Sequence, residues 1–149
     1  MDTIHLPQDF RYFLKLLNIH KAEYLLIGGF AVGYHGYPRA TGDMDIWIAV
    51  SPENAEKMVN LSKEFGFDIP DMTTDLFLKK RQVIRMGMPP IRIEVLTDIS
   101  GVNFDECYDE RVTDFIDGIR VSIISSKHLK INKKASGRLK DLNDLEYLL

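Results

Sequence analysis

The sequence contains one cysteine, Cys107, so no disulfide can form within the chain. No motif surrounds this cysteine, which favours a partly buried thiol over a catalytic one. A chain without disulfides suits a reducing compartment, and we therefore expect a cytoplasmic protein.

Long apolar runs are also absent. No segment approaches the roughly 18 apolar residues that span a membrane. The apolar residues near the N-terminus are interrupted by Gln8, Asp9, Arg11 and Lys15, unlike those of a signal peptide. We expect a soluble protein with no membrane association.

An excess of positive charge is missing too. The formal net charge is -3, which gives no general attraction to nucleic acid, although a local basic patch is still compatible with phosphate binding. The hydrophobic fraction of 45% and the charged fraction of 28% are ordinary for a globular protein. With 149 residues the chain is below the length at which chains usually split, so residues 1–149 are predicted to form a single domain.

A glycine pair follows the first apolar run. Residues 24–27 are apolar and end at Gly28-Gly29, and residues 30–34 can continue as a helix, which predicts a strand, a tight turn and a helix. Without side chains, such a turn lets backbone N–H groups approach a phosphate closely. A glycine pair on its own is more often an ordinary tight turn.

Residues 43–50 alternate between polar and apolar, which predicts a strand with Asp43 and Asp45 on one face and apolar residues on the other. Further strands are predicted at 82–86, 91–97, 112–116 and 119–124, and helices near 10–17, at about 52–65 and after Ser125. Together these elements predict an α/β (α+β) fold, in which a small mixed, twisted sheet is flanked by helices.

Two carboxylates on one strand face repel each other unless a cation lies between them. Magnesium prefers oxygen ligands and commonly joins one or two carboxylates to substrate phosphates, so Asp43 and Asp45 are a plausible half-site. Glu94, on another predicted strand, is a candidate to complete it. Taken alone, an Asp-x-Asp pair is more often a pair of solvated surface side chains.

The combination of Gly28-Gly29, a short helix and Asp43-Met44-Asp45-Ile46 resembles the signature of the DNA polymerase beta-like nucleotidyltransferase superfamily. Residues 27–32 and 39–45 resemble in particular its small bacterial branch, which is related to abortive-infection toxins and minimal nucleotidyltransferases. Residues 132–141 also fit that branch, so the resemblance spans nearly the whole chain.

The resemblance implies a nucleotidyltransferase fold and a magnesium-dependent enzyme. Gly28 and Gly29 would cradle phosphates, while Asp43, Asp45 and Glu94 would hold two Mg²⁺ ions, or Mn²⁺ in their place. The implied reaction transfers a nucleoside monophosphate from an NTP to an acceptor hydroxyl and releases pyrophosphate.

Glu94 is the least secure of these residues. Asp98 is a nearby acid, and Glu94 could instead pair with Arg92 across the sheet surface. We favour Glu94 because it lies inside the predicted strand rather than at its end.

Four further residues are candidates for nucleotide binding. Arg39 and Thr41 precede the carboxylate pair and could equally be ordinary loop residues. Lys134 and Arg138 belong to a late basic segment and, being four residues apart, would share a helix face, although an exposed cationic face is the simpler alternative.

The sequence leaves the substrates open. The acceptor could be tRNA, a protein or a small molecule such as an aminoglycoside, and the donor base is unspecified. The main alternative is a non-catalytic, nucleotide-binding regulatory protein or toxin–antitoxin component with a partner protein. A plain interaction domain is a third possibility, although it would leave the glycine and carboxylate spacing unexplained.

Overall fold

A mixed six-stranded sheet forms the centre of the molecule, with the strand order β3-β4-β2-β1-β6-β5. The computed structural model describes residues 5–37, 42–88 and 90–148. Two neighbouring pairs, β2 with β4 and β1 with β6, are parallel, and the other three are antiparallel. The strands are β1 (Tyr24–Ile27), β2 (Asp43–Ile48), β3 (Val83–Met88), β4 (Ile91–Leu96), β5 (Val112–Ile116) and β6 (Ile119–Ile123).

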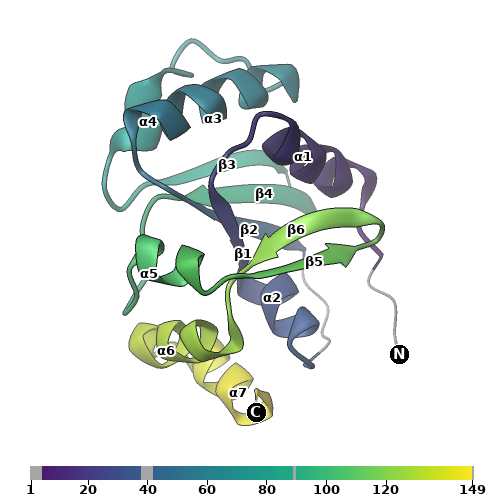
Figure 1. Cartoon of the computed structure of the whole chain (residues 1–149), viewed down its shortest axis with the longest axis vertical. Helices are drawn as coiled ribbons and strands as arrows, with labels where there is room; N and C mark the ends of the chain where they lie inside the picture. Colours follow the sequence, from purple (N-terminus) through teal and green to yellow (C-terminus); the bar gives the residue numbers. More distant parts are fainter. Residues whose placement is uncertain (1–4, 38–41, 89, 149) are drawn as a thin grey trace.

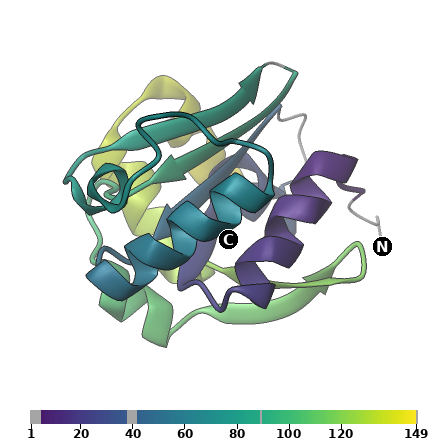
Figure 2. The same ribbon diagram turned by 90° about the horizontal axis from the view of Figure 1, so that it is seen from above.

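Helices cover both faces of this sheet. Two of them, α1 and α3, lie side by side across one face, whereas α6 and α7 lie together on the opposite side (Figures 1 and 2). The helices are α1 (Gln8–Ile19), α2 (Gly28–Tyr34), α3 (Pro52–Glu64), α4 (Thr74–Leu78), α5 (Phe104–Asp109), α6 (Ser126–Ser136) and α7 (Leu139–Tyr147). The mixed α/β architecture confirms the predicted fold class.

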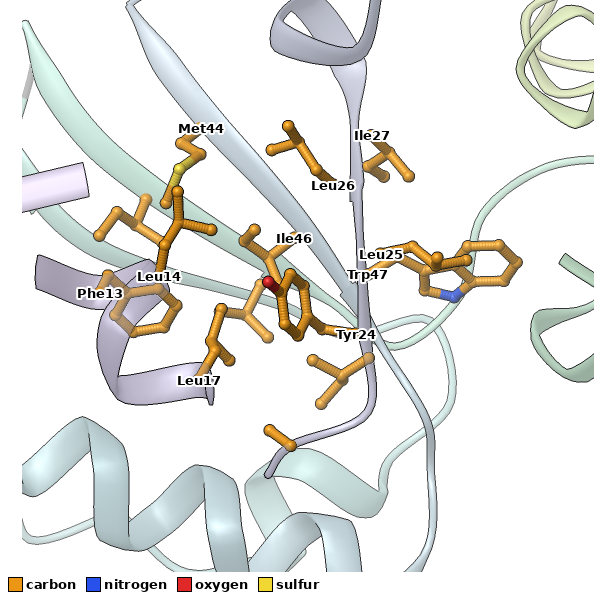
Figure 3. Close-up of a cluster of buried hydrophobic side chains, with 14 of the residues drawn as sticks. Phe13, Leu14, Leu17, Tyr24, Leu25, Leu26, Ile27, Met44, Ile46 and Trp47 are labelled. Atoms are coloured by element: carbon orange, nitrogen blue, oxygen red, sulfur yellow. The ribbon is translucent and has the colours of Figure 1, made fainter. Parts of the chain in front are cut away.

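The alternation of β2 separates the core from the polar face. Met44 and Ile46 are fully buried and lie on the side of the sheet where α1 contributes Phe13 and Leu14 (Figure 3). Trp47 points to the other side, where its ring meets the ring of Phe104 at a centroid distance of 5.1 Å. Burial of large apolar side chains on both sides fixes the register of β2, because a shift by one residue would bring its aspartates into the core.

Strand pairing places the acidic residues side by side. Asp45 in β2 lies opposite Glu94 in the parallel strand β4, and opposite Ile27 in the antiparallel strand β1. Asp43 lies opposite Arg92 in the same ladder. The end of β1, where Gly28 begins α2, is therefore adjacent to the two carboxylate positions.

The C-terminal segment differs from the prediction. Gly137 adopts a left-handed conformation with φ 66° and ends α6, so α7 begins afresh at Leu139. Lys134 in α6 and Arg138 at the N-cap of α7 consequently do not share a helix face, and that expectation was wrong. A glycine accepts positive φ at little cost, which is why helices commonly end there.

Cys107 is buried in α5, and burial raises the pKa of its thiol to about 11. This agrees with the expectation of an inert thiol, because the reactive form is the thiolate. Among the helices in the described ranges, none is long and apolar enough to cross a membrane.

Candidate active site

One open cleft with a volume of about 840 Å³ contains most of the residues singled out in the sequence. Gly28 and Gly29 line it together with Asp43, Asp45 and Glu94. These residues come from the end of β1, the start of α2 and two neighbouring strands. The fold thus gathers into one place residues that span 67 positions from Gly28 to Glu94.

Gly28 and Asp45 are in very close contact. A Cβ atom placed on Gly28 would lie 2.2 Å from Oδ2 of Asp45, a distance that real Cβ contacts do not reach. Gly28 also has a φ of 67°, which other residues rarely adopt. The glycine is therefore required both by the turn and by the position of the carboxylate.

Asp45 is the most perturbed acid of the site. Burial, together with the neighbouring charges of Glu94 and Asp43, raises the pKa of its carboxyl to about 7, although Lys140 acts in the opposite direction. Its Oδ1 atom is buried and has no hydrogen-bond partner among the described residues. A buried acceptor without a partner is costly unless a ligand satisfies it.

Two arginines contact the acidic cluster. Nη2 of Arg92 lies 2.9 Å from Oδ2 of Asp43 and 3.1 Å from Oε1 of Glu94. Nε of Arg85 lies 3.2 Å from the same Oε1 atom. Hydrogen bonding to Asp43 raises the pKa of Arg92, which is fully charged in any case. The Arg92–Glu94 pair, which the sequence offered as the alternative to metal binding by Glu94, is present, and Arg92 contacts Asp43 as well.

Part of a buried ion-pair network, including Lys133 and Asp141, also lines the cleft. Nζ of Lys133 lies 2.7 Å from Oδ1 of Asp141 and 3.1 Å from Oδ2 of Asp144, and all three side chains are at least 95% buried. Asp141 also accepts hydrogen bonds from Ser136 and from Nε of Arg138. Burial alone would raise the pKa of Asp141, but these hydrogen bonds outweigh it and lower the pKa to about 2.

The basic residues of the C-terminal segment differ in whether they line the cleft. Lys133, Arg138 and Lys140 line it, and the side chain of Arg138 is 75% exposed. Lys134 is exposed and is not among the residues that line the cleft. Arg39 and Thr41 lie outside the described residues.

Asp98 lines the same cleft as Glu94 but lies beyond the end of β4. Only Glu94 of the two is in register with Asp45. The geometry therefore favours Glu94 as the third carboxylate, while its role stays a prediction.

The donor set agrees with a magnesium site completed by substrate. Asp43, Asp45 and Glu94 supply only oxygen atoms, which Mg²⁺ prefers, and the Oδ1 atom of Asp45 lacks a partner. Within the part of the chain that the structure describes, no three acidic, histidine or cysteine side chains form a ready-made cage. Mg²⁺ sites at substrate phosphates commonly use only one or two carboxylates, so such a cage is not required.

No protein-family model matches this sequence, and no curated protein matches it either. Solved structures match its fold over most of the chain. One is TM1012 from Thermotoga maritima, assigned as a nucleotidyltransferase, with 15% identity, a TM-score of 0.58, and coverage of 92% of this chain and 88% of that one.

A second similar structure is an antigenic nucleotidyltransferase-like protein from Paracoccidioides brasiliensis, with 21% identity, a TM-score of 0.55, and coverage of 91% and 71%. A third is the lincosamide antibiotic adenylyltransferase LnuA in its lincomycin-bound form, with 14% identity, a TM-score of 0.58, and coverage of 99% and 98%. At these identities the likeness establishes the fold. The chain has the nucleotidyltransferase fold that the resemblance in sequence implied.

Proposed function

We propose that this protein is a nucleotidyltransferase that transfers a nucleoside monophosphate from an NTP to an acceptor hydroxyl. The observation that carries the proposal is the convergence of Asp43, Asp45 and Glu94, from two paired strands, with Gly28 and Gly29 in one cleft. Glycines that expose the backbone and a cluster of oxygen ligands are the two features that a triphosphate with its metal ions needs. The nucleotidyltransferase fold supports the same reading.

The glycine turn is the proposed site for the triphosphate. Gly28 and Gly29 bring the backbone to the cleft without side chains in the way. Lys140, which lines the cleft and acts on the charge of Asp45, adds positive charge for the phosphate oxygens, and the largely exposed Arg138 lines the cleft as well, although its Nε atom is bonded to Asp141. Lys133 is neutralised by Asp141 and Asp144, so we assign it to holding α6 and α7 together.

The three carboxylates are the proposed ligands of Mg²⁺. Bound Mg²⁺ would polarise the α-phosphate and stabilise the departing pyrophosphate. Asp45, with its raised pKa and partnerless Oδ1 atom, gains most from a cation, because the cation replaces the proton that burial would otherwise retain. No side chain of the protein needs to act as a nucleophile, since the acceptor hydroxyl attacks the α-phosphate directly.

The fold does not specify the acceptor, because one fold supports many substrates, so a panel of acceptors has to be tested. One similar structure is an adenylyltransferase with a bound lincosamide antibiotic, so small hydroxyl compounds belong in the panel beside tRNA and proteins. Each α-³²P-labelled NTP would be incubated with each acceptor class, with Mg²⁺ or with EDTA.

The proposal predicts Mg²⁺-dependent labelling of one acceptor class by the wild type. Labelling should be lost in Asp43→Asn and Asp45→Asn, which keep the size of the side chain and remove its charge. Equal labelling by both variants and the wild type would contradict the assigned role of the carboxylates.

A further inference from the structure

One nitrogen atom of Arg92 bridges two of the proposed metal ligands. Its Nη2 atom lies 2.9 Å from Oδ2 of Asp43 and 3.1 Å from Oε1 of Glu94. The side chains of Arg92, Asp43 and Glu94 are 28%, 33% and 17% exposed, so the contacts are partly shielded from water. The guanidinium thus already holds a position between carboxylates that a cation would take.

Strand register fixes this arrangement. Arg92 is paired with Asp43 across the β2–β4 ladder and lies two residues before Glu94, so all three side chains project from the same face of the sheet. The contact follows from the backbone rather than from a chance surface rotamer.

Arg85 offers a comparison within the same cleft. It comes from the neighbouring strand β3, is paired in register with Glu94, and approaches Oε1 of Glu94 at 3.2 Å. Its side chain is 56% exposed, so water screens its charge more strongly than that of Arg92. Arg85 therefore contacts only Glu94 of the two carboxylates, from the solvent-exposed edge of the cluster, whereas Arg92 contacts both Glu94 and Asp43.

We infer that Arg92 is an internal counter-cation that competes with a divalent metal ion for Asp43 and Glu94. An oxygen atom that accepts a hydrogen bond from the guanidinium directs fewer lone pairs to a metal ion, and two cations at one position repel each other. Metal binding in the absence of nucleotide must therefore displace Arg92. This inference rests on the metal sites of the proposed function and adds a positioning role for Arg92.

Nucleotide binding changes the balance. A triphosphate in the same cleft provides new anionic oxygens for the displaced guanidinium, and arginine binds phosphate well. Metal and nucleotide then strengthen each other's binding, because each removes part of the cost of displacing Arg92. The metal ion alone binds weakly, and the site fills when metal and nucleotide arrive together.

Calorimetric titration with Mn²⁺ alone, at pH 8 and without nucleotide, tests this competition. Arg92→Met keeps the length of the side chain and removes its charge, so the dissociation constant for Mn²⁺ should fall about two- to fivefold, as expected for the loss of a partly exposed ion pair. Arg92→Lys should bind Mn²⁺ about as weakly as the wild type, because the competing charge is restored. Arg85→Met is the matched control and should change the constant less.

The metal-free melting temperature is the second readout. Arg92→Met should melt below the wild type without metal, because it leaves two neighbouring carboxylates without this counter-charge. If Arg92→Met does not fold, Arg92→Gln serves instead, since it can still donate a hydrogen bond to Asp43.

Unchanged or weaker Mn²⁺ binding in the folded, uncharged variant would overturn the inference, as would an equal gain in Arg85→Met. If Arg92→Met gains affinity while the wild type labels no acceptor, the competition stands and the transferase proposal fails. If transfer is observed without a gain in Arg92→Met, the competition alone fails. Absence of Mn²⁺ binding in every variant would overturn the inference and the proposed metal sites together.

Discussion

Gly28 and Asp45 are so close that the carboxylate occupies the space of a side chain on the glycine: a Cβ atom at Gly28 would lie 2.2 Å from Oδ2 of Asp45. The sheet produces this contact, because Ile27, the residue before Gly28, is paired with Asp45 in the β1–β2 ladder. The proposed phosphate turn and the proposed metal ligand are therefore one structural unit.

The first prediction concerns Gly28→Ala. The added methyl group must push Asp45 aside and also strains a residue with a φ of 67°. Gly137→Ala is the matched control, because its φ is 66° and nothing lies within 4 Å of the added atom. We expect Gly137→Ala to lose about 1 kcal/mol of unfolding free energy through backbone strain alone, and Gly28→Ala about 1–3 kcal/mol more through overpacking.

Urea unfolding measures both variants, and the transfer assay should show loss of activity only in Gly28→Ala. Equal destabilisation of the two variants, with activity retained in both, would show that the contact between Gly28 and Asp45 has no role.

The second prediction separates the two candidates for the third carboxylate. Glu94 is paired with Asp45, whereas Asp98 lines the cleft from beyond β4. Glu94→Gln should lower kcat on the order of 100-fold or more, as when one preorganised electrostatic group is removed from an active site. Asp98→Asn should change kcat only slightly. The reverse ranking in steady-state kinetics would assign the role to Asp98.

The β2 strand and its aspartates could be predicted from sequence because the alternation of side chains is local. The proximity of Glu94 to Asp45 could only be suggested, since it depends on which strands pair: β2 lies between β1 and β4, and not beside β3, the next strand in the sequence. The contact of Arg92 with Asp43 was not foreseen for the same reason.

The helix α7 shows a different limit of sequence reasoning. Its leucines have helical spacing in the sequence, which is typical of an apolar stripe, yet Leu139 is 87% exposed while Asp141 and Asp144 are 1% exposed. Lys133 explains the difference, because it gives both aspartates a buried cationic partner. Periodicity reports which face is apolar, but a specific ion pair decided which face is buried.

The third prediction is a pH dependence of stability. The pKa of Asp45 is raised to about 7 in the folded protein from an ordinary value of 3.8, so the folded state holds a proton that the unfolded chain has released. The stabilisation that this proton gives to the folded state is fully present below the pKa of the unfolded chain. It is lost as the pH rises through the pKa of the folded protein. Between about pH 4 and pH 7, the free energy of unfolding of the metal-free wild type should therefore fall by up to a few kcal/mol relative to that of Asp45→Asn.

Urea unfolding in EDTA across this range measures the difference between the two proteins. A difference that stays constant with pH would mean that Asp45 titrates normally.

The fourth prediction concerns the network under the C-terminal helices. Lys133→Met leaves Asp141 and Asp144 without their buried cation, and breaking such a pair from one side costs about 3–5 kcal/mol of unfolding free energy. The neighbouring Lys134 is exposed, so Lys134→Met should change stability by no more than about 0.5 kcal/mol. Similar midpoints for both variants in urea would contradict the structural role of Lys133.

The fifth prediction addresses the central claim that the cleft binds a metal–nucleotide complex. A thermal-shift series would compare ATP, GTP, CTP and UTP, each with and without Mg²⁺, on the wild type and on the Asp43→Asn, Asp45→Asn double variant. A ligand that binds only the folded state raises the melting temperature, so at least one NTP should stabilise the wild type only with Mg²⁺, and the shift should vanish in the double variant. No shift with any nucleotide, or an equal shift in the double variant, would contradict the account.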